Sequence, residues 1–120
     1  MLVMVWAAGA RETDADTVKP YQEALARDPD DKDALRAVGV YYLQHGEFGE
    51  AEKCGQHLLR MGEGGYEPDF CLLWGHFIVG AATIDTGDGM ECYAHLEQAR
   101  TIAERVQDHK ALMSIYNSFG

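Results

Sequence analysis

The chain has 120 residues, 47% of them apolar, which is enough for one domain with a buried core. It carries 20 acidic against 10 basic residues, for a formal net charge of −10. Such a surface repels nucleic-acid phosphates and anionic headgroups, so nucleic-acid and membrane binding are not expected. The 3 cysteines are an odd number without a C-x-x-C pair, which favours a reducing, cytoplasmic compartment over a disulfide framework.

The first ten residues are apolar and end in small residues, as a secretory signal does. They lack the basic segment that precedes the apolar core of a signal peptide, so we interpret residues 2–10 as a short buried helix. No apolar run reaches the roughly 18 residues of a membrane-spanning helix. A polar turn is expected over Arg11–Asp16. The helix that follows is capped by Thr17 and ends near Asp28, because Pro29 disfavours helical backbone at the residue before it.

The centre of the chain predicts a helical hairpin. Asp30 and Asp31 are good N-caps for a helix whose apolar residues recur every three or four positions, and Gly46 ends this helix. A second helix is predicted from Phe48 to Met61, where three glycines end it: Gly62, Gly64 and Gly65.

Three more helices are predicted towards the C-terminus. The first begins near Pro68 and is apolar nearly all round, so we expect it to be the most buried helix. The second covers about 90–106 after a turn over 85–89, and Asp88 is its expected cap. The last covers about 108–120. Short polar connections make neighbouring helices antiparallel, so the fold class is all-α with six or seven helices.

One motif in the hairpin has a spacing typical of helical repeats. It reads Leu35-x2-Val38-Gly39-x2-Tyr42, with Ala51 following in the next helix. This resembles the tetratricopeptide repeat, whose pattern is W-x2-L-G-x2-Y, then A-x3-F, then P, at a period of 34 residues. Leucine replaces the tryptophan here, and a glycine stands at the aromatic position of the second helix.

Other parts of the chain repeat the pattern. Thr17 and Ala51 are one period apart, and Tyr116-x2-Phe119-Gly120 resembles the start of a further unit. A looser third unit reads Cys71-x2-Trp74-Gly75-x2-Ile78. The resemblance implies one domain of helix-turn-helix units stacked as a short right-handed superhelix. Its units would be 1–29, 30–65, a lengthened 66–107, and a terminal helix over 108–120.

The resemblance implies binding of a peptide or helical segment in a concave groove lined by the first helix of each unit. The groove positions would be Asp33, Arg36, Val40, Leu43, Gln44, Asp69, Leu72, Leu73, His76 and Val79. Only Arg36 fits the carboxylate clamp of chaperone-adaptor members, so binding of a chaperone C-terminal tail is not expected. An apolar strip flanked by acids instead predicts an amphipathic protein or peptide partner with basic edges. Alternatively, the N- or C-terminal helix covers this strip.

Few residues in the sequence support a catalytic or metal-binding site. Asp85-Thr86-Gly87 matches the aspartic-protease triplet, but that chemistry needs two carboxylates in a β-rich frame. Cys71 with His76 and Cys92 with His95 are candidate zinc ligands by residue type. The two cysteines each begin a helix of an antiparallel hairpin, which separates them by roughly 20 Å. We therefore expect no enzyme activity, no metal and no cofactor.

The sequence predicts a non-catalytic interaction module. Two other interpretations stay open. The chain could be a structural subunit or fragment of a longer helical-repeat scaffold, with a homodimer through the terminal helix. It could also be a small chaperone of this repeat type for a secreted or assembly component.

Overall fold

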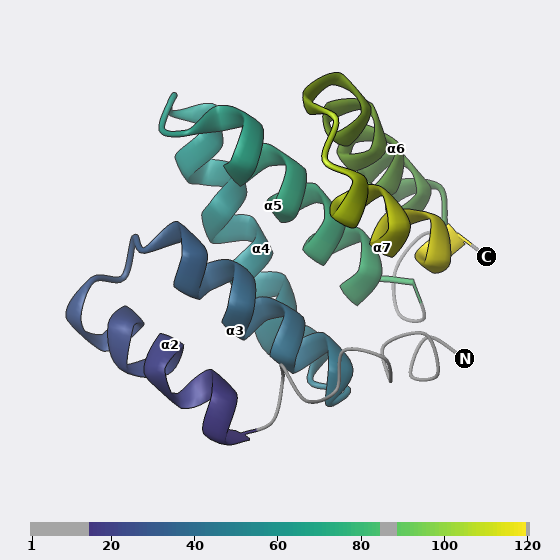
Figure 1. The fold of residues 1–120 in the computed structure, drawn as a ribbon. Helices are drawn as coiled ribbons and strands as arrows, with labels where there is room; N and C mark the ends of the chain where they lie inside the picture. The colour runs from purple at the N-terminus through teal and green to yellow at the C-terminus, as the bar shows by residue number, and fades with distance from the viewer. Residues whose placement is uncertain (1–14, 85–88, 120) are drawn as a thin grey trace.

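A computed structural model describes residues 15–84 and 89–119, and within these ranges every regular element is a helix (Figure 1). The predicted helix over 2–10 and the expected cap Asp88 lie outside the described residues. The prediction of an all-α fold is confirmed for the part described. The helices are α2 (Ala15–Arg27), α3 (Lys32–Gln44), α4 (Phe48–Glu63), α5 (Pro68–Ala82), α6 (Gly89–Val106) and α7 (His109–Phe119).

Local signals set most helix ends where the sequence predicts them. The Asp31 carboxylate caps α3 by accepting a hydrogen bond from the backbone N–H of Ala34 at 3.1 Å. Past the end of this helix, Gly46 has φ of +75°, a conformation that glycine adopts without strain. Pro68 is the first residue of α5, where its missing N–H removes no helical hydrogen bond.

The start of α2 differs from the prediction. This helix begins at Ala15, so Ala15 and Asp16 are helical and Thr17 is not the N-cap. Alanine is the strongest helix former, and an extra half-turn forms ahead of Thr17. Pro20 is thereby placed inside the helix, where it leaves one backbone carbonyl without its usual N–H donor.

Gly62 was predicted to end the second helix of the hairpin, and this prediction is wrong. Gly62 is buried inside α4, and a Cβ added to it would lie 2.8 Å from Cγ of Leu72 in α5. Its role is close packing, and this overrides its weak helix propensity. The helix ends one residue later at Glu63, where Gly64 is the C-cap and Gly65 has φ of +95°.

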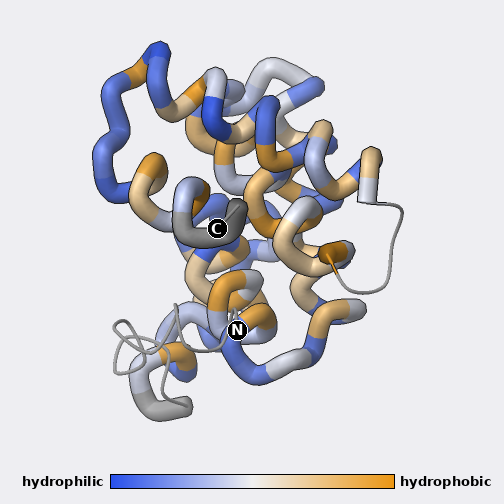
Figure 2. Tube along the Cα trace, turned by 90° about the vertical axis from the view of Figure 1, so that its right-hand side faces the viewer, coloured by the Kyte–Doolittle hydropathy of each residue, from blue (hydrophilic) through white to orange (hydrophobic). Residues whose placement is uncertain are grey.

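Each helix packs against its neighbours in the chain, and α3 also packs against α5 (Figure 1). Consecutive helices run antiparallel, whereas α3 and α5 run in the same direction. In Figure 2 the outer turns are mainly hydrophilic and the hydrophobic residues lie mostly along the helices. The Cα radius of gyration is 13.1 Å, as expected of a compact domain of this length.

The core is centred on α5, which is the most buried helix, as its composition predicts. Phe77 and Ile78 are fully buried there, and Leu58 of α4 and Ile115 of α7 complete the centre of the cluster. None of the described helices is long and apolar enough to cross a membrane.

Glycines bring α4 and α5 into close contact. A Cβ on Gly55 would lie 2.7 Å from Cγ2 of Val79 and 3.2 Å from the backbone oxygen of Gly75. A Cβ on Gly75 would lie 2.8 Å from Leu59 and 3.0 Å from the backbone oxygen of Gly55. The two backbones therefore cross almost without side chains between them, and a larger residue at Gly55 would not fit.

Candidate partner-binding surface

A half-buried strip runs along the side of α3 that faces α5. Arg36, Val40 and Gln44 lie at successive helical turns, and each is partly exposed. On the facing helix, Phe70 and Trp74 are also one turn apart and partly exposed. We call the set Lys32, Arg36, Val40, Gln44, Phe70 and Trp74 the α3–α5 seam.

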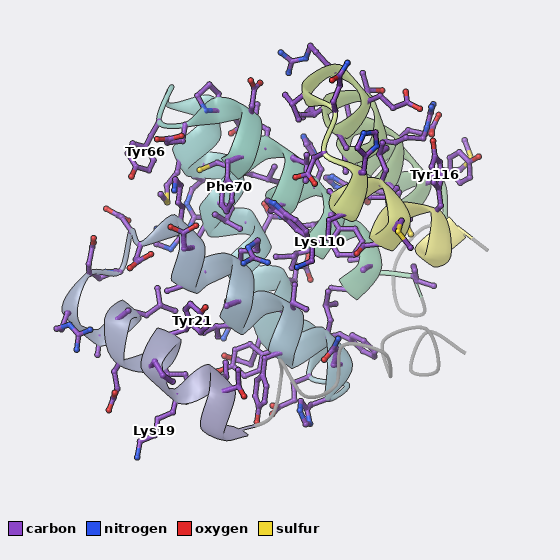
Figure 3. All side chains as sticks on the ribbon, in the orientation of Figure 1. Lys19, Tyr21, Tyr66, Phe70, Lys110 and Tyr116 are labelled. Atoms are coloured by element: carbon purple, nitrogen blue, oxygen red, sulfur yellow. The ribbon has the colours of Figure 1, made fainter. Side chains whose placement is uncertain are left out.

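Cations of α3 lie over aromatic rings of α5 along this seam. The Lys32 Nζ atom is 4.8 Å from the centre of the Phe70 ring, and Figure 3 shows Phe70 at the start of α5, next to α3. One turn further on, the Arg36 guanidinium carbon is 5.2 Å from the centre of the Trp74 ring. Each such pair is worth about 0.5–1 kcal/mol at a partly exposed site, so the two pairs hold α3 and α5 in register.

Carboxylates surround the Lys32 end of the seam. The Lys32 Nζ atom donates a hydrogen bond to Oδ2 of Asp33 at 3.3 Å. Burial disfavours the charged ammonium, but the hydrogen bond to Asp33 and the charges of Asp33 and Glu67 outweigh it and raise the pKa of Lys32. Asp69 is exposed in the first turn of α5 and accepts a hydrogen bond from Arg105 at 2.7 Å. Asp33 therefore lies at one end of the seam, whereas Asp69 is paired with α6.

Gln44 closes the other end of the seam with an unsatisfied acceptor. Its side-chain Oε1 atom is buried and accepts no hydrogen bond within the part of the chain that the structure describes. An unpaired buried acceptor costs about 1–3 kcal/mol, and few occur in a native protein. A donor that reaches Gln44 would recover this free energy.

Several predicted groove residues do not lie on this surface. Leu43, Leu73 and Val79 are buried, with 4%, 2% and 2% of their surface exposed, so the prediction that they line an open groove is wrong. Val79 faces Gly55 of α4, and Leu72 is turned towards the same helix at Gly62. The physical reason is that α5 lies between α3, α4 and α6, so most of its surface belongs to the core.

His76 was also predicted to line the groove, but it faces α6. Its Nδ1 atom is 3.0 Å from Nδ1 of His95, and the two ring centres are 5.2 Å apart. Burial and the nearby His95 lower the pKa of His76 to about 4, so its ring is neutral at physiological pH. The sequence argument missed this pair, because it excluded a shared metal site from the distance between Cys71 and Cys92 alone.

The signal that could have found the histidine pair is Gly80, one turn after His76. A Cβ there would lie 3.2 Å from Cβ of His95, so the missing side chain lets α6 approach at this level. The Cys92 thiol donates a hydrogen bond to the backbone oxygen of Gly80 at 3.1 Å.

Burial and the charge of Glu50 raise the pKa of Cys54 to about 11, which makes it a poor nucleophile at neutral pH.

Within 15–84 and 89–119, no three His, Cys, Asp or Glu side chains are placed to hold one metal ion. No family model, curated protein or solved structure matches the chain. The geometry of the α3–α5 seam is therefore the basis for a functional proposal.

Proposed function

We propose that this protein is a non-catalytic interaction module that binds an amphipathic protein segment along the α3–α5 seam. The proposal includes a tetratricopeptide-like arrangement, in which α3 with α4 and α5 with α6 are stacked helical units. The packing of α3 on α5 supports this arrangement, because stacked units bring their first helices together. The buried, unpaired acceptor of Gln44 carries the functional proposal, since it lies on a half-exposed strip and needs a donor.

The chemistry of the seam favours an apolar segment with basic edges. Val40 and Trp74 offer partly exposed apolar surface, and the unpaired Gln44 Oε1 atom would accept from an N–H group of the bound segment. Asp33 and the net charge of −10 attract a basic partner. The cations of the seam already lie over rings of α5, so an acidic tail would gain little from them.

A charge placed in the seam tests the proposal. A fluorescent amphipathic peptide with lysines at its ends should bind, and Val40→Glu should weaken its binding at least tenfold, as measured by anisotropy. Val106→Glu is the matched control, because Val106 is 41% exposed on α6, away from the seam. Circular dichroism must show unchanged helicity in both variants. A helicity collapse in the Val40 variant would make this residue part of the core and contradict the proposal.

Exposed apolar residues on α7 favour a second candidate, in which the chain is a scaffold subunit that pairs through this helix. Met113 is 67% exposed and Tyr116 is 51% exposed, one turn apart on the same face. A dimer in sedimentation equilibrium that dissociates on Tyr116→Lys would support this candidate. Tyr66→Lys is the matched control, because Tyr66 is 53% exposed outside α7. A wild-type monomer at all concentrations would exclude it.

A further inference from the structure

The contact between α5 and α6 brings together two groups that can ligate a metal ion. His76 and His95 approach with their Nδ1 atoms 3.0 Å apart, and both side chains are partly exposed. In the present state one ring donates its Nδ1–H to the Nδ1 lone pair of the other. The pair lies away from the α3–α5 seam, and the proposed partner binding does not use it.

The distance between the two Nδ1 atoms suits a shared metal ion better than it suits two positively charged rings. Two imidazole nitrogens at ~2.1 Å from one ion lie ~3.0 Å apart at right angles and ~3.4 Å apart in a tetrahedron. The observed 3.0 Å matches the right-angled arrangement of square-planar and octahedral ions. A tilt of each ring would direct both lone pairs at one ion beside the line between the nitrogens.

We propose that His76 and His95 form a two-histidine site for a divalent transition-metal ion that links α5 to α6. Imidazole donors suit Zn²⁺, Ni²⁺ and Cu²⁺, and Cu²⁺ binds most tightly in the usual order of affinities. No third His, Cys, Asp or Glu joins the pair among the described residues, so water fills the remaining positions. A site of this kind is open and exchangeable, unlike a structural zinc site with four protein ligands.

The protons balance without a change of charge. Binding releases to water the proton that the two Nδ1 atoms share, and the ring that loses it takes a proton at Nε2 from water. Each imidazole is then neutral, with Nδ1 on the metal and Nε2–H outward.

Calorimetric titration of CuCl₂ and ZnCl₂ into chelator-treated protein without a histidine tag tests the site. We expect one ion per chain, with Cu²⁺ tighter than Zn²⁺. His76→Asn and His95→Asn should each weaken Cu²⁺ binding at least tenfold. His57→Asn is the control and should leave the affinity unchanged, because His57 pairs with Asp30 at 2.8 Å, away from His76 and His95. Unchanged Cu²⁺ affinity in both His76→Asn and His95→Asn would overturn the proposal. A stoichiometry of one ion per two chains would also overturn it.

A spectroscopic measurement keeps the test independent of the folding of the variants. The electron paramagnetic resonance spectrum of the wild-type Cu²⁺ complex should show splitting from two equivalent imidazole nitrogens. Splitting from one nitrogen, or from three or four, would contradict a site built from His76 and His95 alone. Addition of MgCl₂ should leave the protein unbound, because a hard cation prefers oxygen ligands.

Discussion

At the scale of single residues, the crossing of α4 and α5 depends on the absence of a side chain at Gly55. A methyl group there would meet the backbone nitrogen of Val79 at 3.1 Å and the backbone oxygen of Gly75 at 3.2 Å, and neither atom can rotate away. We expect Gly55→Ala to lower the free energy of unfolding by about 1–3 kcal/mol, despite the better helix propensity of alanine. Urea unfolding followed by circular dichroism measures this change.

Gly49 is the matched control for this prediction. It lies in the same helix, but a Cβ there would meet nothing within 4 Å. Gly49→Ala should therefore raise the free energy of unfolding, by up to about 1 kcal/mol. Equal changes in the free energy of unfolding would contradict this prediction. They would show that helix propensity alone sets the effect and that the close crossing does not contribute.

At the scale of the helices, the two helices of the α3–α4 hairpin differ in how their N-termini are capped. Asp31 caps α3 through its carboxylate, whereas Glu47 stands at the N-cap of α4 without a side-chain hydrogen bond to that helix. Asp31→Ala should cost about 1 kcal/mol of stability, and Glu47→Ala should change it by less than about 0.5 kcal/mol. The midpoints of urea unfolding measure both, and a larger loss for Glu47→Ala would contradict this assignment of the caps.

Among the features of the helices, most ends could be predicted from the sequence, but contacts between helices could not. The ends of α3 and the start of α5 follow from Asp31, Gly46 and Pro68, because caps, turns and proline act on their immediate neighbours. The role of Gly62 could not be predicted in this way, since it depends on Leu72 of another helix.

The surface of α5 was harder to predict for a related reason. The helix is apolar nearly all round, so its sequence does not tell which residues face α3, α4 or α6. Arg36 and Val40 of α3 are partly exposed, and their role as groove residues stays a prediction. His76 and Val79 were assigned to the same groove from repeat register alone, and their actual neighbours are His95 and Gly55.

At the scale of the whole molecule, stability should fall in mild acid because of His76. Its pKa is lowered to about 4 in the folded chain, against about 6.5 when unfolded, so the unfolded chain binds this proton first as the pH drops. The contribution of His76 to the free energy of unfolding should be constant above pH ~6.5 and should decrease progressively between pH ~6.5 and ~4. For a site that is partly screened by water, the loss is on the order of 1–2 kcal/mol.

Comparison of variants isolates this contribution. In the presence of a chelator, His76→Asn should lose less stability between pH 7 and 4.5 than the wild type, as measured by urea unfolding at each pH. His57→Asn should follow the wild type, since His57 lies on α4 beside Asp30, away from the pair. If His76→Asn and the wild type lose stability in parallel, the acid sensitivity arises elsewhere in the chain.

The packing of every helix on its chain neighbours has a consequence for how the molecule forms. Contacts close in sequence need little loop closure, so we expect refolding in milliseconds or faster. The α4–α5 hairpin has the closest crossing and contributes Leu58 and Phe77 to the centre of the core, which makes it the expected nucleus. Stopped-flow kinetics should show Leu58→Ala slowing refolding, while Val18→Ala in the peripheral α2 mainly speeds unfolding. The chain would then assemble outward from its middle in both directions.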